Sequence, residues 1–71
     1  MIVTFNYTNW RGEHSARRVK FLGVEFGVSE YHVKPQFLMH AFDLDKGVYR
    51  LFAMADMSDV TPAGALLTLK D

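Results

Sequence analysis

Apolar and polar residues alternate with a period of two along most of this chain, which is typical of half-buried β-strands. In residues 1–8, Val3, Phe5 and Tyr7 share one face of the predicted strand, and threonine and asparagine residues share the other. The same alternation predicts three further strands and a shorter fifth one, which cover about residues 15–26, 36–44, 48–55 and 57–60. The pattern therefore predicts an all-β chain.

Glycine, asparagine and proline mark the breaks between these strands. Residues 9–13 and 45–47 contain the residue types that suit chain reversals. Gly23 predicts a bulge or sharp bend, because a strand this long must coil in a small domain. We expect residues 27–35 to be irregular, since Pro35 cannot donate a hydrogen bond within a sheet. Four or five short strands joined by tight turns predict a small, strongly bent antiparallel sheet that forms an SH3-like or Sm-like barrel.

The predicted strand at 36–44 carries apolar residues on both faces. One face holds Phe37, Met39 and Ala41, and the other holds Leu38, Phe42 and Leu44. A strand of this kind is expected to be buried on both faces. In so small a domain one face belongs to the core, and the other needs a crossing segment, a ligand or a second subunit.

The C-terminal tail, residues 61–71, allows two interpretations. Thr61 followed by Pro62 is typical of a helix N-cap with proline at the first helical position, which predicts a short helix over residues 63–69. Residues 66–69, Leu-Leu-Thr-Leu, would fit an edge strand equally well.

The amino-acid composition excludes several classes of protein. The chain has 71 residues, 49% of them hydrophobic, which supports one small core and a single domain over residues 1–71. It has no cysteine, so disulfides and thiolate chemistry are excluded. Eight basic and eight acidic residues balance, so we expect no bulk attraction to nucleic acid or anionic lipid. No secretory signal or membrane-length apolar run is visible, and we expect a cytoplasmic protein without membrane contact.

The order of these motifs resembles the WYL domain family, especially its small stand-alone bacterial and phage members, over about residues 2–60. The family's turn glycine and Ser-x-Arg-x-Val strand correspond to Gly12, Ser15, Arg17 and Val19. Its Ala-Tyr strand end and Gly-x-x-Arg-x-Phe run correspond to Ala41, Phe42, Gly47, Arg50 and Phe52. Three features depart from the family pattern: the naming tripeptide is Phe37-Leu38-Met39, a proline is replaced by Phe21, and an arginine is replaced by Asp56.

This resemblance implies an Sm-like or SH3-like barrel that senses a ligand, often a nucleotide or nucleic acid, through arginines and an aromatic residue near strand ends. In larger members the barrel regulates an attached helix-turn-helix, which implies a role in transcription regulation. Nothing in this sequence fits a helix-turn-helix, so direct reading of an operator is not expected.

Arg17 and Arg50 stand out on physical grounds as well. Each shares strand parity with apolar residues, and a guanidinium on the core side is costly unless it is paired or lies at a barrel mouth. Two such groups predict a cationic pocket, because the guanidinium fork suits phosphate or carboxylate. The alternative is that each arginine pairs with a carboxylate and only orders a turn; the candidate partners are Asp43, Asp45 and Glu13.

Neighbouring basic and aromatic residues extend the candidate site. Arg11 and Arg18 lie near Trp10, an arrangement that suits phosphate contacts and base stacking with single-stranded nucleic acid, although a solvated strand face would look the same. Tyr31 and Phe37 offer further rings at the predicted barrel mouth. The full ligand-binding set comprises Trp10, Arg11, Arg17, Arg18, Tyr31, Phe37 and Arg50.

Other chemistries find little support. The three histidines, His14, His32 and His40, lack zinc spacing, and we predict no metal and no cofactor. No phosphate-cradling glycine loop or nucleophile elbow is present, so we do not predict an enzyme. The sequence favours a regulatory binding module for a nucleotide or single-stranded nucleic acid. The alternative is a homodimer or protein-interaction module that uses the two-sided strand and the C-terminal apolar segment.

Overall fold

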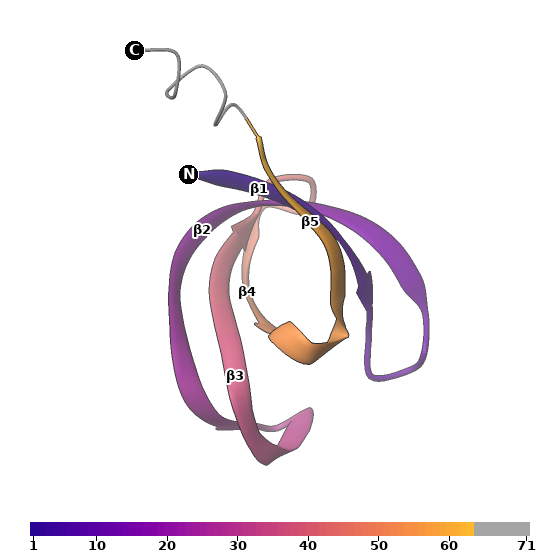
Figure 1. Ribbon diagram of the computed structural model, residues 1–71, viewed down its shortest axis with the longest axis vertical. Coiled ribbons are helices and arrows are strands. Elements are labelled where there is room, and N and C mark those ends of the chain that lie inside the picture. Colours follow the sequence, from indigo (N-terminus) through magenta and orange to yellow (C-terminus); the bar gives the residue numbers. More distant parts are fainter. Residues whose placement is uncertain (64–71) are drawn as a thin grey trace.

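The computed structural model describes residues 1–63 and shows a small all-β domain (Figure 1). Its strands are β1 (Ile2–Thr8), β2 (His14–Ser29), β3 (His32–Asp43), β4 (Val48–Ala53) and β5 (Met57–Ala63), with a 3-10 turn, η1 (Met54–Asp56), between the last two. All pairings are antiparallel, and the strands form one sheet in the order β4-β3-β2-β1-β5. The predicted all-β class and antiparallel sheet are confirmed. Within residues 1–63, no helix has the length and apolar character needed to cross a membrane.

One face of the sheet builds the core. Cross-strand partners in an antiparallel pair point to the same side, and the pairs Val3–Val19 and Met39–Phe52 bring buried residues together. The ring of Phe52 meets those of Phe5 and Tyr7 edge to face, at centroid distances of 5.2 and 4.9 Å. These contacts join β1 to β4, which are not neighbours in the sheet. The buried core comprises Val3, Phe5, Tyr7, Val19, Met39, Ala41 and Phe52.

Several local predictions are confirmed. The buried face of β1 carries Val3, Phe5 and Tyr7, as the alternation indicates. The pairing of β2 with β3 shifts register between Phe21 and Gly23, which is the irregularity that this glycine predicts. Gly47 has φ of 68° in the β3–β4 turn and donates its N–H to the carbonyl of residue 43 at 2.8 Å. A side chain is rarely tolerated at that φ, which explains glycine there.

The prediction of an irregular segment at 27–35 is wrong. β2 continues to Ser29 and β3 already begins at His32, so only two residues form the turn. Pro35 lies within β3, but β4 pairs only with residues 38–43 of that strand. This end of β3 is therefore a free edge, where a missing N–H is tolerated.

The predicted helix start at Thr61-Pro62 is also wrong. Both residues belong to β5 and lie opposite Thr4 and Val3 of β1. β5 is an edge strand, so Pro62 is accommodated as Pro35 is. The rest of the C-terminal prediction, including the alternative strand at 66–69, lies outside the described residues.

Burial of β3 on both faces is only partly observed. Leu38 and Met39, on opposite faces, are both buried, as is Ala41. Phe37 is 58% exposed, because the sheet face it shares with Met39 is not covered at that end. The apolar residues of a strand thus do not predict how much of its length is buried by other parts of the chain.

Candidate functional site

A partly buried ion cluster lies where β2, β3 and β4 meet at one end of the core. Arg17 Nη1 lies 3.4 Å from Asp43 Oδ2, and Arg50 Nε lies 3.6 Å from the same oxygen. The register explains the meeting, since Asp43 is paired with Val19 on β2 and with Val48 on β4. Each arginine is two residues from one of those partners and therefore on the same face.

Asp43 is fully engaged in this cluster. Its side chain is only 2% exposed, and its other oxygen, Oδ1, accepts the N–H groups of Asp45 and Lys46 at 3.0 Å each. It therefore orders the β3–β4 turn and balances one of the two guanidinium charges. Two arginines and one aspartate leave a net charge of +1. Of the carboxylates predicted as partners, Asp43 forms ion pairs with both arginines.

Arg17 is the most buried cation of the cluster. Its side chain is nine-tenths buried, and its Cζ lies 5.9 Å from the Tyr7 ring centroid and 5.7 Å from that of Phe52. Its Nε has no hydrogen-bond partner among the described residues. A buried N–H without an acceptor costs about 1–3 kcal/mol.

A cavity of about 180 Å³ opens beside this cluster. Trp10 and Tyr31 form part of its wall, with ring centroids 5.6 Å apart and planes at 12° to each other. This stacking brings the β1–β2 loop against the β2–β3 turn, although the two residues are 21 positions apart in the sequence. The cavity walls include Trp10, Arg17, Tyr31, His32, Arg50 and Phe52.

The loop that carries Trp10 is held by its own hydrogen bonds. Asn9 Oδ1 accepts the N–H groups of Arg11 and Glu13, and Asn9 Nδ2 donates to the Glu13 carboxylate, all at 2.9 Å. Gly12 supplies the positive φ of 80° that closes the turn. The Arg11 Cζ lies 5.0 Å from the Trp10 ring centroid, so the indole also contacts a cation. A pre-ordered indole loses little entropy when it stacks on a ligand.

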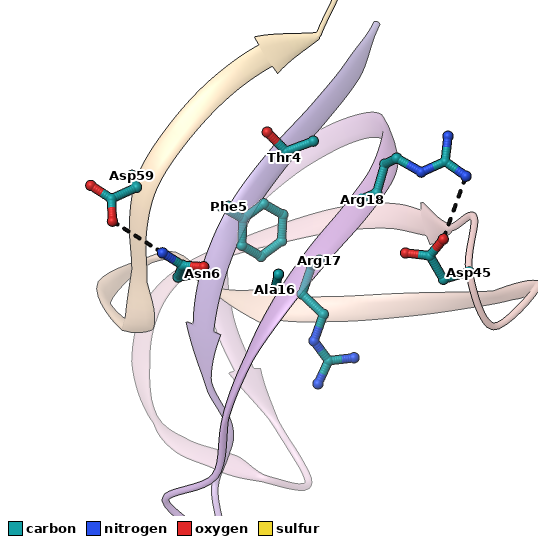
Figure 2. A pocket seen from close by; sticks show the side chains of 8 residues that line it. All are labelled: Thr4, Phe5, Asn6, Ala16, Arg17, Arg18, Asp45 and Asp59. Carbon is teal, nitrogen blue, oxygen red and sulfur yellow. Dashed lines mark hydrogen bonds and ion pairs between the residues drawn. The ribbon is translucent and has the colours of Figure 1, made fainter.

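Arg18 lies on the opposite side of β2. Arg18 lines a separate recess of about 280 Å³. Figure 2 shows that the Arg17 and Arg18 side chains leave the strand in different directions. There Arg18 pairs with Asp45 at 3.4 Å, and Asn6 donates to Asp59 at 3.0 Å. Both acidic side chains of this recess, Asp45 and Asp59, are therefore already paired. Arg18 therefore does not join the cluster that Arg17 and Arg50 form.

Phe37 belongs to a third region. Its ring packs edge to face on Phe26, with centroids 5.0 Å apart, in an apolar groove of about 630 Å³ that also includes Val24 and Met54. Of the predicted ligand-binding residues, the structure thus brings four together around one cavity: Trp10, Arg17, Tyr31 and Arg50. Arg11 contacts the Trp10 ring but does not line this cavity.

Tyr7 and His32 line the same cavity. Sequence reasoning did not place Tyr7 among the candidate site residues. For Tyr7 a signal existed, since a phenol on a core face requires a hydrogen-bond partner. Its oxygen accepts the N–H of Ala53 at 2.9 Å. Burial raises the pKa of Tyr7 above its usual value of 10.0, and the hydrogen bond from Ala53 offsets only part of this rise.

The raised pKa of Tyr7 predicts a specific loss of stability at high pH. The fold prefers the neutral phenol, so its contribution is complete below pH 10 and is lost as the pH rises through the raised pKa. Urea unfolding between pH 8 and 11 should show this loss, with a slope of up to about 1.4 kcal/mol per pH unit. In Tyr7→Phe the slope from this group should vanish, while stability at pH 8 should fall by about 1–3 kcal/mol because Ala53 loses its acceptor. An unchanged slope in the variant would contradict the assignment.

Within residues 1–63, no three histidine, aspartate or glutamate side chains gather where they could hold a metal ion. Comparison with known protein families, with curated protein sequences and with solved structures finds no match to this chain.

Proposed function

We propose that this chain is a non-enzymatic binding module that holds an anionic, ring-bearing ligand in the cavity beside Arg17 and Arg50. The observation that carries this proposal is that two guanidinium groups, those of Arg17 and Arg50, line one cavity and share a single carboxylate, Asp43, which leaves a net charge of +1. A phosphate oxygen in the cavity would accept hydrogen bonds from the partly exposed Arg50 guanidinium. A hydrogen bond to a charged group contributes about 1.5–3 kcal/mol.

The aromatic wall supports a ligand that carries a flat ring. Trp10 and Tyr31 present parallel rings at the cavity, and both are more than half exposed. A nucleobase stacked on such a ring contributes about 1–3 kcal/mol. Phosphate and base together describe a nucleotide or a single-stranded nucleic acid.

We also propose that the sheet belongs to the SH3-like barrel class and that the chain is a WYL-like regulatory module. The contacts of Phe52 with Phe5 and Tyr7 support the first point, because they join strands that are separated in the sheet. The meeting of Arg17 and Arg50 supports the second, since these are the arginines that the WYL resemblance implies in ligand sensing. Both points remain predictions.

Titration of the chain with cytidine 5′-monophosphate, followed by Trp10 fluorescence, tests the binding proposal, because Trp10 is the only tryptophan. Arg50→Ala should weaken binding about tenfold or more, since this guanidinium borders the cavity and is partly exposed. Arg18→Ala is the matched control, because it removes an arginine from the other side of β2, and it should leave the affinity unchanged.

Arg17→Ala is a second variant that tests the same cavity. It also should weaken binding at least tenfold, and circular dichroism must first show that the variant is folded, since Asp43 loses a partner. If neither cavity variant changes the affinity, or if Arg18→Ala changes it as much, the assigned site is wrong.

One observation favours the alternative function, self-association. Val24, Phe26, Phe37 and Met54 expose an apolar groove, and exposed patches of this kind often mark protein contacts. A second copy of the chain is the occupant that this alternative predicts. Residues 1–36 hold five basic and three acidic residues, and residues 37–71 hold three and five, so copies in antiparallel arrangement would place opposite charges together. Sedimentation that shows only monomer at micromolar concentration would contradict it.

A further inference from the structure

A second recess adjoins the proposed anion site and shares a wall with it. It has a volume of about 310 Å³ and is lined by Ser29, Glu30 and Tyr49 together with three residues of the first cavity. The shared residues are Tyr31, Arg50 and Leu51. Arg50 thus borders both recesses, and a group bound by its guanidinium would have space on either side.

The charge of the ion cluster limits the kind of anion that fits. Arg17 and Arg50 together with Asp43 give a net charge of +1, and the carboxylate is already fully engaged. A phosphodiester carries one negative charge and is balanced by this cluster. A terminal phosphate carries about 1.5 to 2 negative charges at pH 7 and leaves an excess in a partly buried site.

Each recess also offers its own aromatic surface. Trp10 lines only the first, Tyr49, which is 75% exposed, lines only the second, and Tyr31 lines both. The Tyr49 ring is held edge to face by Phe42, with centroids 4.8 Å apart. Glu30 adds an acceptor to the second recess, which suits the exocyclic amine of a base such as cytosine.

We propose that the ligand is a single-stranded fragment of at least two nucleotides, whose bridging phosphodiester lies against Arg50 with one base in each recess. This inference rests on the proposed function and extends it, because it assigns a second subsite to Glu30 and Tyr49. A mononucleotide would fill only one of the two recesses.

The test compares cytidine 5′-monophosphate with the dinucleotide CpC as ligands of the full chain, by Trp10 fluorescence and by NMR chemical shifts. CpC should bind about tenfold or more tightly than the mononucleotide, in keeping with the stacking of one additional base. Tyr49→Ala should reduce this ratio to about one while the affinity for the mononucleotide stays unchanged. Tyr49→Phe keeps the ring and should keep the ratio, and Glu30→Gln should lower the affinity for CpC only.

The possible results separate the two proposals. If neither compound binds, the proposed function itself fails. If both bind equally and depend on Arg50, the anion site stands and the two-nucleotide inference is overturned. If CpC binds more tightly but Tyr49→Ala does not alter the ratio, the second base lies elsewhere and the assigned subsite is wrong.

Discussion

Replacing Phe52 with alanine is expected to lower the free energy of unfolding by about 3–5 kcal/mol. Phe52 is 2% exposed, and its ring contacts both Phe5 and Tyr7 edge to face. A cavity at this point removes packing from β1 and β4 together, and these strands have no backbone pairing with each other to hold them. The ring of Phe52 also supports the guanidinium of Arg17, so its loss disturbs the core and the ion cluster at once.

The consequence is large because the domain is small. A chain of 71 residues has a total stability of about 4–11 kcal/mol, so much of it depends on this single ring. Urea unfolding followed by circular dichroism should show a much lower midpoint for Phe52→Ala than for the unaltered chain. Phe26→Ala is the matched control, since Phe26 is 62% exposed and its removal should cost less than about 1 kcal/mol. Equal losses in the two variants would show that Phe52 is not the centre of the core.

Local chemistry explains which parts of this fold could be predicted. The buried face of β1, the irregularity at Gly23 and the turn at Gly47 each depend on neighbouring residues, and all three were predicted correctly. Pro35 and Pro62 misled the prediction because their tolerance depends on lying at a free edge. Edge position is a property of the whole sheet, which a single strand does not reveal.

For the candidate site, too, local features could be predicted, and features that depend on the whole sheet could not. Parity placed Arg17 and Arg50 on the core face, and the structure brings both to one cavity. The alternation of strand faces does not tell where along a strand the sheet stops being covered, and Phe37 lies in the apolar groove, apart from the cavity of the two arginines. The carboxylate of Asp43 forms ion pairs with both arginines, and this arrangement depends on the register of three strands. The sequence offered it only as one of several partners.

Removing the carboxylate of Asp43 should have the second large effect. Asp43→Ala leaves the nine-tenths buried Arg17 without its ion-pair partner and leaves two N–H groups of the turn without an acceptor. Breaking one side of a buried pair costs about 3–5 kcal/mol. Asp45→Asn is the control, because its pair with Arg18 is about half exposed on both sides and should contribute no more than about 1 kcal/mol. Urea unfolding of both variants checks the comparison.

Asp43→Asn separates the roles of charge and hydrogen bonding at this position. Its amide oxygen can still accept the N–H groups of Asp45 and Lys46, so it should be more stable than Asp43→Ala. The net charge of the cluster rises from +1 to +2, because two arginines are then opposed by no aspartate. The affinity for cytidine 5′-monophosphate should therefore increase relative to that for CpC, since a doubly charged phosphate is now balanced. An unchanged ratio of the two affinities would mean that the charge on Asp43 does not select the anion.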